Sequence, residues 1–202
     1  MKLLGISGSL TPTSRTTEVI RLVLDQAVAF DPGVEATLLD LRDYNLAWCD
    51  GRNPADYTGD TRVVIDMVAA ADAYVVGSPM YRGSYTGVFK NLFDLVPNDA
   101  PHGKAVGIVA TGGSDHHFLA IEHQLRPLLS FFQMPTVPGA VYAQNAHFVN
   151  GRLVDEAVLA NVRRLAEETV RLWRATSERG GGPAYPAIQR KPGEEARVTP
   201  RP

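Results

Sequence analysis

Short apolar segments of strand length alternate with longer segments of helical periodicity along most of the chain. The strand-like segments are residues 3–6, 34–39, 73–76, 105–110 and 137–142. The helical segments are residues 15–30, 60–71, 84–95, 115–133 and 155–177. Because the strand-like segments are apolar on both sides, we expect them to be buried in a parallel sheet with helices on both faces. Right-handed crossovers then predict an α/β fold, a doubly wound five-stranded parallel sheet in the order 2-1-3-4-5.

Length, charge and cysteine usage restrict the class of protein further. The chain has 202 residues and a formal net charge of −2, which fits one domain without the basic excess of a nucleic-acid-binding surface. Residues 1–177 are predicted to form this domain, and residues 178–202, rich in Gly, Pro and charged side chains, a flexible tail. Cys49 is the only cysteine, which indicates a reducing compartment. No apolar run fits a signal peptide or a membrane span, so we expect a cytoplasmic protein.

The segment between the first strand and the first helix carries many hydroxyl groups and one arginine. In such a sheet, ligands bind at the carboxyl ends of the strands, and the N-terminus of a helix favours an anion. Residues 7–17 match neither a Walker loop nor GxGxxG, so a monophosphate is the predicted anion. The candidate phosphate ligands are Ser9, Ser14, Arg15, Thr16 and Thr17. The alternative is a polar turn in which Ser14 only caps the helix.

The segments after the third and fourth strands have compositions that suit a flat heterocycle. Residues 77–87 add two tyrosines, a methionine and an arginine to the expected turn residues, which gives an aromatic and apolar loop. Residues 110–114 contain a glycine pair, which leaves backbone N–H groups open to the acceptor atoms of a ring. The candidate ring-binding residues are Pro79, Met80, Tyr81, Arg82, Gly83, Ser84, Thr111, Gly112, Gly113 and Ser114. Each segment could instead be a simple strand-to-helix turn.

These three segments together make the chain resemble the NAD(P)H-dependent FMN reductase family. The resemblance rests on residues 8–9 and 14–17, on residues 78–81 and 87–91, and on residues 111–114. Within the family, the chain is similar to reductases that supply reduced flavin to monooxygenases of the alkanesulfonate or methanesulfonate type. The resemblance implies a flavodoxin-like fold, FMN with NADPH or NADH as cofactors, and a flavin-dependent monooxygenase as partner. It also implies that the candidate residues above hold the phosphate and flank the isoalloxazine ring.

The predicted helix 115–133 contains a proline well inside its length. Pro127 cannot donate a hydrogen bond to the carbonyl of His123, and its ring crowds that carbonyl. The helix must therefore kink or widen into a π-type turn near His123. Some similar reductases carry a π-helix at the subunit interface, with a tyrosine where His123 stands here, and treat flavin as an exchangeable substrate. The alternative is a kink that serves packing alone, with His123 exposed.

The implied reaction is hydride transfer from a nicotinamide to FMN. The cofactors supply this chemistry and the protein binds and orients them, so no classical catalytic residue is assigned. His116, His117, Glu122 and His123 lack the spacing of a metal site, and no metal is expected. The aromatic side chains carried by the ring-binding loops and by the long helix predict a homodimer or homotetramer. They are Tyr81, Tyr85, Phe118, Phe131 and Phe132.

Other functions fit the same sheet. An NAD(P)H quinone or azo reductase would retain its FMN, and an electron-carrier flavodoxin would need an acidic surround that these loops lack. A signalling receiver domain would need clustered carboxylates after the first and third strands, where residues 7–9 and 77–79 have none. Arg15, Arg82 or Arg126 could meet the 2′-phosphate of NADPH, but no spacing decides between NADH and NADPH.

Overall fold

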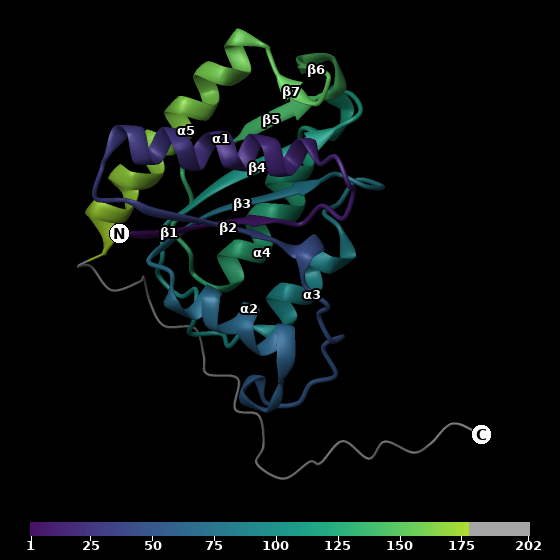
Figure 1. Cartoon of the computed structure of the whole chain (residues 1–202), viewed down its shortest axis with the longest axis vertical. Coiled ribbons are helices and arrows are strands. Elements are labelled where there is room, and N and C mark those ends of the chain that lie inside the picture. Colours follow the sequence, from purple (N-terminus) through teal and green to yellow (C-terminus); the bar gives the residue numbers. More distant parts are fainter. Residues whose placement is uncertain (178–202) are drawn as a thin grey trace.

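A parallel sheet of five strands forms the centre of the molecule (Figure 1). The computed structural model describes residues 1–177, so the predicted tail at 178–202 lies outside the described residues. The strands are β1 (Lys2–Ser7), β2 (Glu35–Asp40), β3 (Ala73–Pro79), β4 (Val106–Gly112) and β5 (Val141–Gln144). All neighbouring strands are parallel and their order is β2-β1-β3-β4-β5, which confirms the predicted topology.

Two helical layers cover the sheet. Helices α1 (Arg15–Phe30) and α5 (Glu156–Thr176) pack against each other on one face (Figure 1). Helices α2 (Gly59–Ala70), α3 (Gly87–Leu95) and α4 (Arg126–Phe131) cover the other face. The strands supply both apolar layers, because successive side chains point to opposite faces. In β3, Val75 packs in the layer under α1 and α5, and Tyr74 and Val76 pack in the layer under the other helices.

Two strands extend further than the sequence indicated. β3 continues through residues 77–79 and β4 through Gly112, because the last residues of β3 still pair with β4, Pro79 opposite Thr111. The fifth strand begins later than the predicted segment 137–142. It covers Val141–Gln144, since Pro138 cannot donate to a ladder and Gly139 adopts a φ of 82°.

The predicted helix 115–133 was wrong as one continuous helix. The chain instead forms a 3-10 turn at Asp115–His117, a π-helix at Ile121–Leu125 and then α4. The N–H of Arg126 bonds to the carbonyl of Ile121, five residues back, so the π-type turn predicted near His123 is confirmed. Pro127 lies in the first turn of α4, where its missing N–H costs no helical bond.

A short antiparallel hairpin follows β5 and was not predicted. Its strands are β6 (Phe148–Val149) and β7 (Arg152–Leu153), and they pair directly. Asn150 and Gly151 connect them with φ values of 48° and 80°, as a type I′ turn requires. The hairpin of β6 and β7 lies next to β5 (Figure 1).

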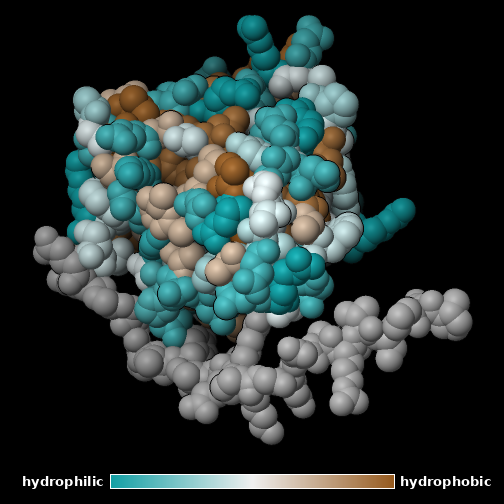
Figure 2. Space-filling model, turned by 60° about the horizontal axis from the view of Figure 1, so that its bottom comes forward, coloured by the Kyte–Doolittle hydropathy of each residue, from teal (hydrophilic) through white to brown (hydrophobic). Residues whose placement is uncertain are grey.

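Apolar side chains also reach the surface. Figure 2 shows them in patches between polar side chains on the side of α2, α3 and α4. Phe118, Leu119 and Phe131, on both sides of the π-helix, are each more than half exposed. None of the helices within residues 1–177 is both long and apolar enough to cross a membrane.

Candidate functional site

The loop after β1 is held tightly against the ends of β3 and α3. The N–H of Gly8 donates to the carbonyl of Gly77 over 2.8 Å, and the Thr86 hydroxyl donates to the carbonyl of Gly8 over 2.6 Å. A Cβ at Gly8 would lie 2.8 Å from the Cβ of Phe89, closer than real side chains approach. Glycine is therefore required here by the close approach of α3, and the loop leaves the sheet in one fixed direction.

The first turn of α1 uses its hydroxyl groups for different purposes. Ser14 is the N-cap and accepts from the N–H of Thr17, which confirms the capping role considered for it. The Thr17 hydroxyl points into the protein and donates to a carboxylate oxygen of Asp40 over 3.0 Å. The Thr16 hydroxyl lies 2.7 Å from that of Thr111 at the end of β4. Thr16 thus joins the N-terminus of α1 to the fourth strand.

Arg15 is held by the segment after β5. Its guanidinium donates to the side-chain oxygen of Asn145 and lies 5.5 Å from the ring centre of Phe148. Among residues 1–177, Arg15 contacts a neutral amide and an aromatic face and has no carboxylate partner to neutralise its charge. The arginine therefore keeps a positive charge beside the N-terminus of α1, where the helix dipole has the same sign.

The loop after β3 is a tight hairpin. Tyr81 and Ser84 exchange two backbone hydrogen bonds, of 2.7 and 3.1 Å. Arg82 and Gly83 form the turn with φ values of 56° and 81°, and an arginine in this left-handed region is strained. The hairpin presents the Tyr81 ring, which is 53% exposed, at the carboxyl edge of the sheet. Ser84 also donates to Gln124, which ties the hairpin to the π-helix.

The loop after β4 passes close to a tyrosine of β5. A Cβ on Gly112 would lie 2.1 Å from the Tyr142 hydroxyl oxygen, so a side chain at this position would have to displace that hydroxyl. That hydroxyl donates to the carbonyl of Ser114 over 2.5 Å and fixes the loop. Burial, and then the charge of Asp115, raises the pKa of the Tyr142 phenol above its ordinary value. Tyr142 therefore stays protonated and keeps donating over the whole neutral range.

These loops enclose one cavity of about 550 Å³ at the carboxyl edge of the sheet. This volume lies within the range of small-molecule sites. Nine of the predicted residues line it: Ser9, Arg15, Thr16, Pro79, Met80, Tyr81, Thr111, Gly112 and Gly113. The cavity wall does not include Ser14, Thr17, Arg82, Gly83, Ser84 or Ser114. The first two hold the turn before α1, and the next three shape the hairpin after β3.

Sequence reasoning missed five residues of the cavity wall. They are Thr11, Thr13, Asn145, Asn150 and Gly151. The two threonines lie in the hydroxyl-rich segment that was identified, but nothing in their spacing distinguished them from its other hydroxyls. Asn150 and Gly151 form the turn of the β6–β7 hairpin, for which the dipeptide Asn-Gly is a sequence signal.

No group of three His, Cys, Asp or Glu within residues 1–177 is arranged to hold a metal ion. The π-helix leaves His123 exposed, away from the cavity wall. Arg126 is also used internally: its guanidinium donates to Glu122, to the Thr136 hydroxyl and to the carbonyls of Val137 and Gly139. Among the described residues, Arg15 is the one arginine that lines the cavity.

The chain matches known flavin reductases in sequence and in structure. Residues 1–148 match the family model described as NADPH-dependent FMN reductase. An NAD(P)H-dependent FAD/FMN reductase of Geobacillus thermodenitrificans is 47% identical over 85% of this chain and 93% of its own length. The NADH-dependent FMN reductase SfnF of Pseudomonas putida is 34% identical over 83% of this chain and 90% of its own.

A solved structure, NADH:FMN oxidoreductase (EMOB) in its apo form, superposes with a TM-score of 0.72. It shares 24% sequence identity with this chain and covers 88% of it, with 90% of its own length matched, so this likeness supports the fold alone. The match to the family model spans the hydroxyl-rich loop, the β3 hairpin and the β4 glycine pair. The chain therefore belongs to the NADPH-dependent FMN reductase family, whose reaction is the reduction of FMN by NAD(P)H.

Proposed function

We propose that FMN binds in the cavity at the carboxyl edge of the sheet, with its phosphate at the N-terminus of α1. Its ring would lie against the β3 hairpin and the β4 glycines. The observation that carries this proposal is that one cavity joins a hydroxyl-rich helix N-terminus to an aromatic hairpin and a glycine pair. A phosphate needs the first of these surfaces, and a flat ring with acceptor atoms needs the other two.

The phosphate end has the residues that a dianion requires. Ser9, Thr11, Thr13 and Thr16 bring hydroxyl groups to the cavity, and Arg15 brings the positive charge. Hydrogen bonds from a charged donor to phosphate oxygens are shorter and stronger than neutral ones. Ser14 and Thr17, proposed from the sequence as ligands, act by holding the turn, since their oxygens are bonded to the Thr17 N–H and to Asp40.

The part of the cavity proposed to hold the isoalloxazine ring combines apolar side chains with glycine backbone that no side chain covers. Pro79, Met80 and Tyr81 form one wall, and Gly112 and Gly113 form the other. The Met80 N–H donates to the Thr111 carbonyl over 2.7 Å, so the two walls are fixed relative to each other. Bound FMN supplies the hydride acceptor, and the nicotinamide of NAD(P)H supplies the hydride. The residues of this chain stack against, orient and exclude water from the reacting rings.

We further propose that reduced FMN leaves the site and supplies a flavin-dependent monooxygenase of the alkanesulfonate type in the cytoplasm. The resemblance to reductases of sulfonate systems, the relative named SfnF and the π-helix at Ile121–Leu125 support this role. In a coupled assay, this reductase should sustain desulfonation by an alkanesulfonate monooxygenase that receives no other source of reduced flavin. If FMN is reduced but desulfonation is not sustained, the proposed monooxygenase partner is wrong, although the reductase activity itself stands.

The exposed apolar side chains around the π-helix support a homo-oligomer. Leu119 is 58% exposed there, between Phe118 and the π-helix. A Leu119→Glu variant should sediment as a smaller species than the parent, because a charge would be buried in the interface. Val28→Glu is the matched control on α1, where Val28 is 40% exposed on the opposite face of the sheet. Equal sedimentation of all three proteins would place the interface elsewhere.

The reductase assay tests both the reaction and the site. Oxidation of NADH or NADPH by protein freed of flavin should rise with added FMN and saturate. Arg15→Gln should raise the KM for FMN about tenfold or more, because it removes a charged phosphate ligand. Arg21→Gln, at an exposed residue two turns along the same helix that pairs with Glu18, should leave it unchanged.

Two outcomes of the assay would decide against the proposal. Oxidation that does not respond to FMN with either nucleotide would contradict flavin exchange. Protein that stays yellow on dilution and reduces quinones or azo compounds at full rate without added FMN would favour the retained-flavin alternative.

A further inference from the structure

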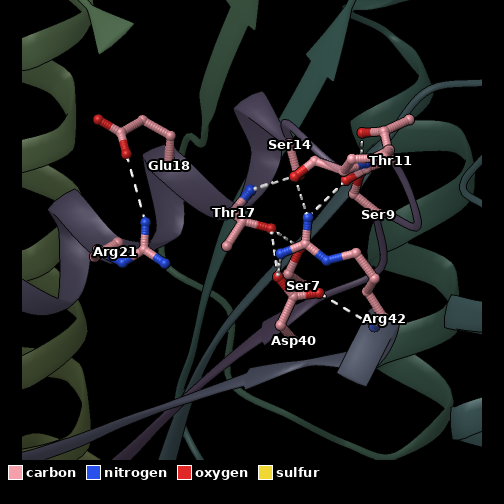
Figure 3. Close-up of polar contacts among 10 residues, drawn as sticks. Ser7, Ser9, Thr11, Ser14, Thr17, Glu18, Arg21, Asp40 and Arg42 are labelled. Atoms are coloured by element: carbon pink, nitrogen blue, oxygen red, sulfur yellow. Dashed lines mark hydrogen bonds and ion pairs between the residues drawn. The ribbon is translucent and has the colours of Figure 1, made fainter. Parts of the chain in front are cut away.

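Arg42, two residues after β2, contacts the hydroxyl-rich loop at residues 11 and 12. One amino group of its guanidinium donates to the backbone carbonyls of Thr11 and Pro12, at 2.8 and 2.5 Å. The other donates to a carboxylate oxygen of Asp40 at 2.8 Å. Figure 3 shows the guanidinium between Asp40 and the loop that carries Ser9 and Thr11. Arg42 does not line the cavity itself.

Asp40 anchors this arrangement in the sheet. It is the last residue of β2, directly opposite Ser7 at the end of β1, and it is 4% exposed. Its carboxylate also accepts from the Thr17 hydroxyl in the first turn of α1 and from the N–H of Arg42. A buried carboxylate is retained only where such partners compensate its lost hydration. Asp40 and Arg42 therefore connect the loop to both the sheet and the helix.

The hydrogen bonds of Arg42 set the direction of the loop's peptide groups. In a trans peptide the C=O and the N–H of the next residue point in opposite directions, and residues 1–177 contain no cis peptide bond. The Pro12 carbonyl points to Arg42, so the Thr13 N–H points away from it, and Thr13 lines the cavity. If Arg42 released these carbonyls, they would be free to turn toward the cavity and repel an anion.

We propose that Arg42 is a positioning residue for flavin phosphate, which holds the carbonyls of Thr11 and Pro12 away from the anion and anchors the loop on Asp40. This inference deepens the proposed function and rests on its placement of the phosphate at the N-terminus of α1. It predicts that Arg42 contributes to the preference for FMN over riboflavin, which has the same ring and ribityl chain without the phosphate. A substitution of Arg42 should not change how the isoalloxazine ring binds.

Fluorescence titration of both flavins measures this preference without turnover. Arg42→Met should raise the Kd for FMN about tenfold or more and leave the Kd for riboflavin unchanged. The ratio of the riboflavin Kd to the FMN Kd, which measures the preference for FMN, then falls by the same factor. Arg42→Lys keeps the charge beside Asp40 but lacks the planar fork that serves two carbonyls and a carboxylate, and it should lose most of the same preference. Arg62→Met is the control, since within residues 1–177 Arg62 pairs with Asp66 alone, on the surface of α2.

The outcomes separate the positioning role of Arg42 from a purely electrostatic role and from a role in folding. An Arg42→Lys variant with the full preference for FMN would overturn the proposal, because charge alone would then suffice. Equal weakening of both flavins in folded Arg42 variants would also overturn it and assign Arg42 to the fold. If Arg15→Gln leaves the preference intact as well, the phosphate lies elsewhere and the proposed function fails too. If Arg15→Gln reduces the preference and Arg42→Lys does not, the positioning inference alone fails.

Discussion

Gly112 is the residue whose missing side chain matters most to the ring end of the cavity. It lies on the cavity wall, and the Tyr142 hydroxyl oxygen lies only 2.1 Å from the position that its Cβ would take. The tyrosine in turn holds the loop through the carbonyl of Ser114. One glycine thus allows the loop to lie close to β5 and leaves the backbone bare toward the cavity.

A Gly112→Ala substitution should destabilise the protein by about 1–3 kcal/mol, because the methyl group must displace the Tyr142 hydroxyl. The adjacent Gly113→Ala is a matched control, since its Cβ would meet no atom closer than the Asn145 side chain at 4.0 Å, and it should change stability by less than about 0.5 kcal/mol. Urea unfolding measures both. Adding Tyr142→Phe should recover part of the loss at Gly112, and equal costs at both glycines would contradict the steric account.

Thr16 and Thr17 are two hydroxyl-bearing residues whose separate roles the sequence could not predict. The pattern of hydroxyls before α1 correctly predicted that a polar cluster marks the N-terminus of this helix. It could not assign each hydroxyl, because consecutive helical residues point in directions about 100° apart. The cap at Ser14 fixes the rotation of the helix, so that Thr17 faces Asp40 inside the protein and Thr16 faces the cavity.

The π-helix is the element that departs furthest from regular structure, and Arg126 holds it in place. The N–H of Arg126 closes the wide turn on Ile121, and its guanidinium, 19% exposed, bonds Glu122 and the irregular segment before β5. The same arginine therefore connects the π-helix to the backbone that leads into the last strand of the sheet.

Replacing Arg126 by Met should lower the free energy of unfolding by about 1.5–3 kcal/mol, because the Val137 and Gly139 carbonyls and the Thr136 hydroxyl lose a charged donor. Arg171→Met is the control: Arg171 pairs with Glu167 and Glu168 on the exposed side of α5, and its loss should cost less than about 0.5 kcal/mol. Chemical denaturation of both variants provides the comparison. A cost at Arg126 no larger than that at Arg171 would show that the π-helix does not depend on this arginine.

The elements differ in how well the sequence predicted them. Continuous apolar strands and amphipathic helices identified the sheet and its order, because burial on both faces leaves a strong pattern. Pro127 revealed the π-type turn, since a proline has a defined steric consequence. The β6–β7 hairpin was missed although Asn150-Gly151 signals it, because its two-residue strands are too short to show any periodicity.

At the scale of the whole molecule, buried phenols couple stability to alkaline pH. Burial is the main cause that raises the pKa of Tyr57, of Tyr74 and of Tyr142 above the ordinary value. Unfolded phenols lose their protons near pH 10, whereas these remain protonated in the folded protein. The unfolded state therefore binds fewer protons above that pH, and stability falls as pH rises.

Unfolding free energies measured between about pH 8 and about pH 11 should decline, with the loss beginning near the pKa of an unfolded tyrosine, about 10. Tyr74→Phe should be less stable at the lower pH, because the phenol donates to the Val68 carbonyl over 2.7 Å. It should also decline less steeply, because one buried phenol no longer contributes. Parallel pH profiles for the parent and the variant would contradict the assignment to Tyr74.

A crystal structure of the FMN complex would show whether flavin phosphate binds at the N-terminus of α1. Phosphate oxygens should lie within hydrogen-bonding distance, about 2.5–3.2 Å, of the Ser9 and Thr16 hydroxyls or the Arg15 guanidinium. The isoalloxazine ring should lie against Tyr81 and Gly112. A phosphate bound away from residues 9–16, or a flavin bound outside this cavity, would show that the site is wrongly assigned.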